Sequence, residues 1–138
     1  MAQAKKRPPM KVASEAMRAW AEALRTELEP WPGVTLKRAF GMVLVYRGEV
    51  VFAALPDTRA LYAEDAILVK FAEEKAALVK RIAAERRFAP GTMGAGGKSK
   101  GEGRKWRIFL VGEDADVHAA IEWLAEAYRL ARAGRGRR

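Results

Sequence analysis

The chain has 138 residues, half of them hydrophobic, with no cysteine and a formal net charge of +9. This length fits one domain, because domains usually contain about 100–200 residues. The absence of cysteine excludes disulfides, thiolate metal sites and a thiol nucleophile. There is no run of about 18 apolar residues and no apolar stretch of the signal-peptide kind. We therefore expect a cytoplasmic protein without a membrane partner.

The positive charge is concentrated at the two ends of the chain. Residues 1–11 carry four cations and residues 129–138 carry five, in both cases without an acid. Residues 12–128 hold 17 cations and 17 acids. Within them, the stretch 80–107 has nine cations against two acids. If the fold brings these segments together, one face is strongly positive. Solvated charge with flexible tails is the plainer interpretation.

The first half of the chain predicts an arm, a helix and several strands. Residues 1–10 lack periodicity and contain two prolines, which indicates a disordered basic arm. Apolar residues three and four apart predict a helix from about Ser14, its N-cap, to Glu29. Alternating and continuous apolar runs then predict strands at residues 34–40, 42–46, 49–55 and 67–71, with a short edge at 61–62.

Glycines mark two places in this strand region. The Arg47-Gly48 pair separates two predicted strands by the spacing of a tight hairpin, and Gly48 supplies a positive φ there. Gly41 lies between two other predicted strands and indicates a bulge or a close backbone approach.

The second half of the chain predicts two helices around a flexible loop and a strand. The elements are a helix at 73–87, a glycine-rich loop at 91–103, a strand at 106–111 and a helix from Asp114 or Asp116 to about Arg132. Hairpin-linked strands favour a two-layer α+β fold, with a mostly antiparallel sheet and the helices packed on one face. We expect one domain over residues 11–132, followed by a disordered basic tail at 133–138.

No motif in the chain carries recognisable chemistry. Residues 94–99 (Gly-Ala-Gly-Gly-Lys-Ser) resemble the end of a phosphate-binding P-loop, but Thr92 stands where that motif needs glycine. His118 is the only histidine, so it makes neither a zinc site nor a triad. Glu73 and Asp114 fall in first turns of helices, where acids oppose the dipole charge without any metal. The sequence thus predicts no catalytic residue, cofactor or metal.

Trp106 has two readings. It lies between Lys105 and Arg107, and aromatics among cations suit single-stranded nucleic acid, because bases stack while cations hold phosphates. It also alternates with Ile108 and Leu110, which favours a place in the core.

Several short segments resemble the TfoX N-terminal-domain family of small bacterial proteins. They are Arg38–Met42, Tyr46–Ala53, Ile67–Phe71, Phe88–Pro90, Trp106–Val111 and Trp123–Ala127. Pro32–Val34 and Ala127–Leu130 are equally similar to the YjbR family, also called MmcQ-like. Both families resemble the secretion-chaperone-like fold, which implies an α+β domain without catalytic residues. Arg47 departs from the usual Asn, and no counterpart of the helical C-terminal domain of TfoX regulators is present.

We therefore expect a non-enzymatic binding or regulatory module that captures nucleic acid or an acidic protein surface. Phosphate contacts would dominate and tolerate any base sequence. The cations expected to bind the polyanion are Lys5, Lys6, Arg7, Lys98, Lys100, Arg104, Lys105, Arg107, Arg132, Arg135, Arg137 and Arg138. The alternatives are a protein-interaction module, for example a homodimer pairing through the sheet, and an enzyme with an unfamiliar site.

Overall fold

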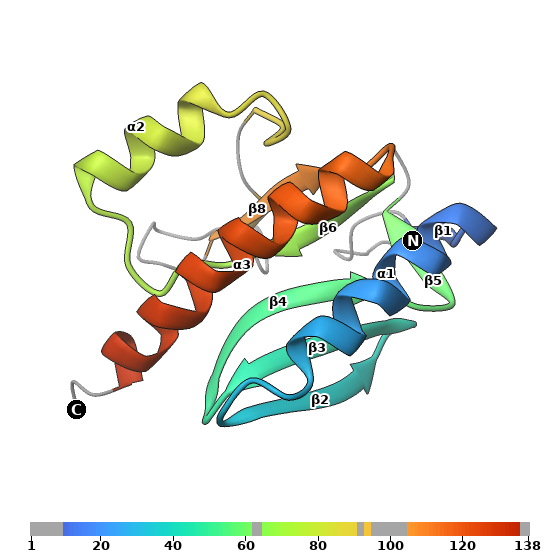
Figure 1. The fold of residues 1–138 in the computed structure, drawn as a ribbon, viewed down its shortest axis with the longest axis horizontal. Coiled ribbons are helices and arrows are strands. Elements are labelled where there is room, and N and C mark those ends of the chain that lie inside the picture. The colour runs from blue at the N-terminus through green and yellow to red at the C-terminus, as the bar shows by residue number, and fades with distance from the viewer. Residues whose placement is uncertain (1–9, 62–64, 91–92, 95–104, 136–138) are drawn as a thin grey trace, which may run out of the picture.

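The computed structural model describes residues 10–61, 65–90, 93–94 and 105–135 (Figure 1). The helices in this part are α1 (Glu15–Leu28), α2 (Ala76–Ala84) and α3 (Asp114–Arg135). The strands are β1 (Met10–Val12), β2 (Val34–Ala39), β3 (Met42–Arg47), β4 (Val50–Pro56), β5 (Arg59–Leu61), β6 (Ala66–Val69), β7 (Met93–Gly94) and β8 (Lys105–Leu110). The main sheet has the order β2-β3-β4-β6-β8-β7 with antiparallel pairing throughout, and β1 pairs with β5 in a small second sheet.

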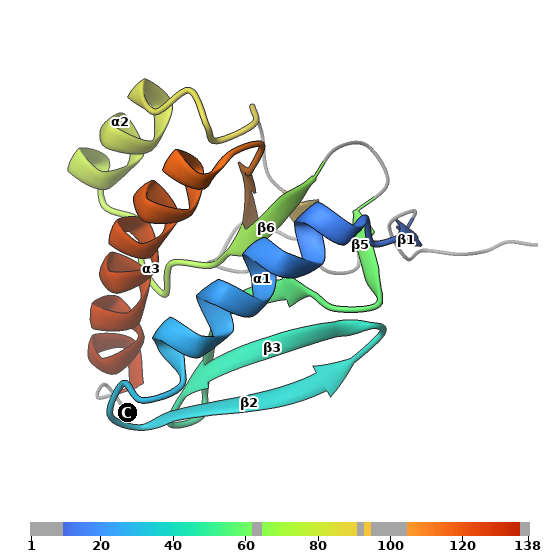
Figure 2. The same cartoon turned by 45° about the vertical axis from the view of Figure 1, so that its right-hand side comes forward.

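The helices lie on one face of the main sheet, which confirms the expected α+β fold. Figures 1 and 2 show α1 and α3 running over the strands, with α2 beside α3. Phe52, Ile67 and Phe109 from the strands and Leu24 and Leu124 from the helices are fully buried between these layers. Burying one large apolar side chain contributes about 1.5–3 kcal/mol. This inner face of the sheet is therefore the main source of stability.

The opposite, outer face of the sheet carries a second apolar cluster. Met42, Ala54, Ala66 and Leu68 are buried there, and Leu44, Trp106, Ile108 and Leu110 pack against them half-buried. Side chains alternate across a strand, so Trp106, Ile108 and Leu110 share this face while Phe109 points to the helices. Trp106 is thus packed against an apolar cluster, but on the face that carries no helix in the described part of the chain.

Helix α1 forms where the sequence places a narrow apolar stripe. Its buried residues are Met17, Ala21, Leu24 and Leu28. The hydroxyl of Ser14 accepts a hydrogen bond from the amide of Met17 at 3.0 Å, which confirms the predicted N-cap. The helix ends at Leu28, one residue before the expected end, because Pro30 cannot continue the ladder.

The bounds of α2 differ most from the expectation. The helix was expected over residues 73–87 and is shorter at both ends. Glu74, expected in its first turn, binds Arg107 of β8 instead. Glu85 takes an extended backbone conformation and ends the helix, because its side chain joins an ion-pair network described below. Tertiary pairing of charges therefore overrides local helix propensity at both ends.

The two ends of the described fold also extend beyond the expected domain. Met10, expected in the disordered arm, pairs with Leu61 in the β1–β5 sheet. Helix α3 continues to Arg135, three residues past its expected end and into the expected tail. Of the short edge expected at 61–62, Leu61 ends β5, which pairs with β1 rather than with the main sheet, and Tyr62 lies outside the described residues.

The turn between β3 and β4 lies one residue later than the sequence suggests. Arg47 pairs with Val50, so the two loop residues are Gly48 and Glu49 rather than Arg47 and Gly48. Gly48 has φ 62°, as a turn with glycine first in the loop requires. Arg47 is therefore the last residue of β3 and not part of the turn. Its guanidinium lies 3.8 Å from the ring centroid of Tyr128 and donates to the Tyr128 carbonyl at 3.0 Å.

Tyr128 fastens the C-terminal half of α3 to this end of the sheet. Its ring makes edge-on contacts with Trp31 and Phe52, at centroid distances of 5.1 and 5.7 Å. Its hydroxyl donates to the Pro32 carbonyl at 2.6 Å. Together with Arg47, these contacts join the α1–β2 turn, the β3–β4 hairpin and α3.

We expect the ring of Tyr128 to matter more than its hydroxyl. Tyr128→Phe should lower the free energy of unfolding by about 0.5–1 kcal/mol, since one hydrogen bond to an exposed carbonyl is lost. Tyr128→Ala should lower it by about 3 kcal/mol, since the aromatic and cation–π contacts are lost as well. Urea denaturation measures both. Equal losses in the two variants would contradict this assignment.

Candidate polyanion-binding surfaces

Several carboxylates of the domain body are bound to arginines. The guanidinium of Arg107 donates to both oxygens of Glu74, at 3.0 and 2.5 Å, and its side chain is only 15% exposed. Asp57 accepts from Arg38 at 2.9 Å and lies 3.8 Å from Arg25. These pairs neutralise cations within the body.

The most connected of these networks centres on Arg87. Its Nε lies 2.6 Å from Asp116, and its Nη1 lies 3.1 Å from Glu85. Asp116 also accepts the backbone amides of Gly112 and Glu113, at 2.7 and 3.2 Å, and so caps the start of α3. The network ties the segment after α2 to the first turn of α3.

Both carboxyl groups of this network have a lowered pKa. Partial burial alone would raise the pKa of Glu85, but hydrogen bonds from the Arg87 backbone, the Trp123 indole and the Arg87 side chain outweigh it. For Asp116, burial is likewise outweighed by hydrogen bonds from Arg87 and Gly112 and by the Arg87 charge, so its pKa falls as well. The hydrogen bond to Asp116 raises the pKa of Arg87, which keeps its charge.

These directions predict a loss of stability in acid. The unfolded carboxyls titrate near about pH 4, so above that pH the stabilisation is fully present. It is lost as the pH falls through the lower folded-state values, because protonation breaks the pairs with Arg87. The melting temperature of E85Q/D116N should fall less between neutral pH and about pH 3 than that of the wild type. E122Q, at an exposed position, serves as the control, and a variant curve parallel to the wild type would contradict the assignment.

Few of the predicted polyanion-binding cations fall within the described residues. Lys5, Lys6, Arg7, Lys98, Lys100, Arg104, Arg137 and Arg138 lie outside them. Lys105 begins β8, Arg132 is exposed on α3, and Arg135 is the last residue of α3. Arg107 is held by Glu74, so a phosphate would have to displace an ion pair made through two hydrogen bonds.

The basic segments join the folded body at opposite ends of the sheet. The N-terminal segment enters at β1, beside the β2–β3 turn, because the amides of Thr58 and Arg59 bind the Gly41 carbonyl at 3.0 Å. The C-terminal half of α3 lies at the other end, where Tyr128 meets Arg47. Figures 1 and 2 both show β1 far from the C-terminal end of α3.

The start of β8 lies at the same end of the sheet as the C-terminal half of α3. Arg107 of β8 pairs with Val69 of β6, which lies toward the end of the sheet where β3 turns into β4. The described residues next to the basic segments therefore lie at two different ends of the sheet.

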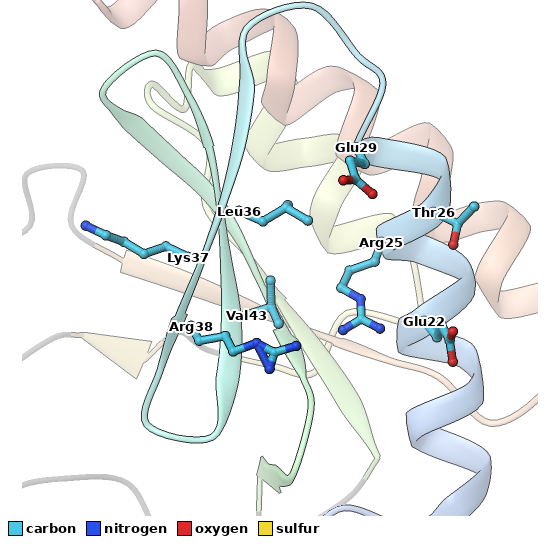
Figure 3. A pocket seen from close by; sticks show the side chains of 8 residues that line it. All are labelled: Glu22, Arg25, Thr26, Glu29, Leu36, Lys37, Arg38 and Val43. Carbon is cyan, nitrogen blue, oxygen red and sulfur yellow. The ribbon is translucent and has the colours of Figure 1, made fainter.

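A cleft of about 340 Å³ lies between α1 and β2 (Figure 3). In the figure, Arg25 of α1 and Arg38 of β2 point toward one another across it, while Lys37 points away from α1. Both arginines are within ion-pair distance of Asp57, and Glu22 and Glu29 add negative charge to the lining. An anion could enter only by competing with Asp57, and the lining offers no histidine or cysteine for catalysis.

The β2–β3 turn is a feature that the sequence reading missed. Phe40 was expected to end a strand, but the strand stops at Ala39, and Phe40-Gly41 forms a two-residue turn with Ala39 paired to Met42. Both turn residues have positive φ, 56° for Phe40 and 77° for Gly41. The side chain of Phe40 is 71% exposed. The signal available in the sequence was a residue followed by glycine between two runs of matched length.

Gly41 confirms the predicted close backbone approach. A Cβ at this position would collide with Cβ and Cγ of Arg59. The Gly41 carbonyl also accepts the amides of Asp57, Thr58 and Arg59, at 3.1, 3.0 and 3.0 Å. The β2–β3 turn is thereby fixed against the β4–β5 connection.

The other motifs considered in the sequence, His118 and the P-loop-like segment, do not form a recognisable site within the described residues. His118 is exposed on α3. Of the P-loop-like segment, only Gly94 is described, in β7. Among the described residues, no three side chains of His, Cys, Asp or Glu gather as metal ligands would. Within the same residues, no helix combines the length and apolarity needed to cross a membrane.

Comparison with known proteins found no matching family model, no matching curated protein and no matching solved structure.

Proposed function

We propose that this protein is a non-enzymatic, cytoplasmic binding module of the TfoX N-terminal type that binds nucleic acid through cations at its ends. The observation that carries the proposal is the distribution of charge. Residues 1–11 and 129–138 hold nine cations and no acid, which equals the whole net charge. A polyanion such as nucleic acid is the partner that such clusters attract most strongly.

The ion pairs of the body support this assignment. Arg87, Arg107 and Arg38 each bind a carboxylate of the body, so they contribute little to long-range attraction. Two of the end cations, Lys11 and Arg129, also bind carboxylates of the body, Asp65 and Glu126, so we assign the binding of nucleic acid to the other end cations. Cations that contact phosphates carry no base information, so we propose binding that tolerates any base sequence.

The proposal predicts a steep salt dependence that the N-terminal cations help to set. Each phosphate contact to a single strand contributes about 0.7 to the slope of log affinity against log salt concentration. K5A/K6A/R7A should therefore reduce that slope by about 2 if all three cations contact phosphate. Fluorescence anisotropy with a labelled single-stranded oligonucleotide, titrated over a range of NaCl concentrations, measures it.

Two further variants control this experiment. K75A/K80A/R86A removes the same charge from exposed positions around α2 and should leave the slope nearly unchanged. R135A/R137A/R138A tests the C-terminal end separately. An affinity that does not change with salt, or an equal loss in the α2 variant, would overturn the proposal.

A second candidate function is homodimerisation through the outer face of the sheet. The observation that favours it is the half-buried apolar group formed by Leu44, Trp106, Ile108 and Leu110 on the face without helices. Apolar groups of this kind mark interaction sites when they form one patch, and a stable dimer buries about 800 Å² on each partner.

This candidate predicts a concentration-dependent mass. Sedimentation equilibrium should show a dimer for the wild type, and L44E should shift it to monomer, since a charge at a dry interface is costly. L36E, at a half-buried position on the inner face beside α1, is the matched control. Circular dichroism must show that both variants are folded. A wild type that remains monomeric at high concentration excludes this function.

A further inference from the structure

In the described part of the chain, strand β2 forms one edge of the main sheet. Hydrogen-bonded pairs alternate along an antiparallel ladder. Gly33 and Gly48 continue the register of β2 on β3, and the amide of Gly48 donates to the carbonyl of Gly33 at 3.0 Å. Lys37 is therefore also in a hydrogen-bonded pair, whereas the backbone groups of Leu36 and Arg38 point away from β3. Among the described residues, none hydrogen-bonds to these backbone groups, so the outer edge of β2 is open to another strand.

The cleft between α1 and β2 lies along the inner face of this edge (Figure 3). Leu36 and Val43 give it an apolar lining from the sheet, and Glu22 and Glu29 line it from α1. Both glutamates are exposed, and no described cation is within ion-pair distance of either. The two arginines of the cleft are instead within ion-pair distance of Asp57. The charge that the cleft leaves available to a ligand is therefore negative.

The two glutamates lie at different ends of the cleft. Glu29 caps the C-terminal end of α1, and the turn that follows leads directly to Val34, whose amide binds the Trp31 carbonyl at 3.1 Å. In Figure 3 the side chain of Glu29 points toward β2, and Glu22 lies nearer to Arg38. Seven helical residues span about 10.5 Å, so each end of the cleft has its own glutamate.

An extended peptide fits the edge and the cleft together. If it pairs antiparallel to β2, as neighbouring strands of this sheet do, one of its residues exchanges both hydrogen bonds with Leu36 and points its side chain into the cleft. An apolar side chain there contacts the apolar lining. The residue two positions further toward the C-terminus of the peptide lies opposite Val34, so a cation at that position approaches Glu29. On the other face, Lys37 points away from α1 and favours neutral or acidic residues of the peptide.

A second copy of the chain suits this site less well than a basic peptide does. Two β2 strands that pair antiparallel are related by a two-fold axis, which puts both copies of α1 on the same side of the joined sheet. The glutamates of one cleft would then face those of the other without a cation to neutralise them. Lys37 and Arg38 also discourage pairing between identical edges, as charged residues on edge strands do.

We propose that the β2 edge and the α1–β2 cleft bind an extended peptide segment of a partner protein by strand addition. The recognised pattern is an apolar residue opposite Leu36 followed, two residues later, by a lysine or arginine opposite Val34 and next to Glu29. This inference goes beyond the proposed function. None of its residues belongs to the basic segments 1–11 and 129–138, so the two activities can fail separately.

Capped synthetic peptides test the order of the recognised residues. The probe Thr-Thr-Thr-Val-Thr-Lys-Thr places valine and lysine on one face, and Thr-Lys-Thr-Val-Thr-Thr-Thr has the same composition with lysine opposite Arg38. In an NMR titration, the reversed peptide should bind roughly 3- to 10-fold more weakly than the probe. Methylation of the valine nitrogen removes the donor to Leu36 and should weaken binding about tenfold, whereas methylation of the next threonine nitrogen should change it little. Equal affinity for both orders would overturn the proposal.

The variant E29K tests the charge of the cleft. It should bind the probe roughly 3- to 10-fold more weakly than the wild type and should bind Thr-Thr-Thr-Val-Thr-Glu-Thr more tightly. E27K is the matched control, because Glu27 is exposed in the same last turn of α1 but does not line the cleft. Both variants should remain folded, since a cation is favourable in the last turn of a helix. Equal losses in E27K and E29K would remove the assigned role of Glu29 and overturn the proposal.

Amide hydrogen exchange tests whether the peptide adds to the edge. In the dilute free protein, the amide of Leu36 should exchange fast and that of Lys37 slowly, because only Lys37 binds β3. A saturating amount of the probe should slow the exchange of Leu36 at least about tenfold. Saturable binding without this protection, or Leu36 already protected in the dilute protein, would overturn strand addition.

Two further outcomes concern the occupant of the site. Protection of Leu36 that appears without peptide and grows with protein concentration would identify a second copy as the occupant and overturn the peptide. No saturable binding of the probe would overturn the proposal as well, while a steep salt dependence of oligonucleotide binding would leave the proposed function standing.

Discussion

The close packing of α3 against the inner face of the sheet is the constraint on which the rest of the molecule depends. Ala120, Leu124, Ala127 and Ala131 are fully buried along the helix. Small side chains at three of these positions let the helix axis approach the strands, so that the aromatic residues of the sheet fill the space around it. The two ends of α3 are then fixed separately, by Asp116 at its start and Tyr128 near its end.

That arrangement also decides where charge can act. The helix brings Asp116 to Arg87, and the short α2 leaves Glu74 within reach of Arg107. Arg87 and Arg107, from the basic stretch 80–107, therefore form ion pairs within the folded body. The net positive charge equals the nine cations of residues 1–11 and 129–138, and the described segments β1 and the C-terminal half of α3 lie at opposite ends of the sheet.

The β2–β3 turn shows the opposite relation between local preference and fold. Elsewhere the residues suit their places, as with Ser14 at the start of α1 and Gly48 in the β3–β4 turn. At Phe40 the backbone conformation and the side chain disagree, and three hydrogen bonds to the Gly41 carbonyl enforce the conformation.

The sequence alone predicted the features that depend on short-range periodicity and on total charge. The stripe on α1, the alternation of the strands and the run of residues in α3 predicted the α+β fold, since burial of one face requires those spacings. The excess of cations at both ends was equally visible. Elements whose ends depend on contacts with residues far away in the sequence could not be predicted in this way. The ends of α2 depend on Glu74 reaching Arg107 and on Glu85 reaching Arg87, and β1 exists because of β5, some fifty residues away along the chain. Phe40 looked like a strand residue because its neighbours alternate, and only the register of β2 on β3 turned it into an exposed tip. Pairings between remote segments have no local signature, so only the tertiary structure could decide them.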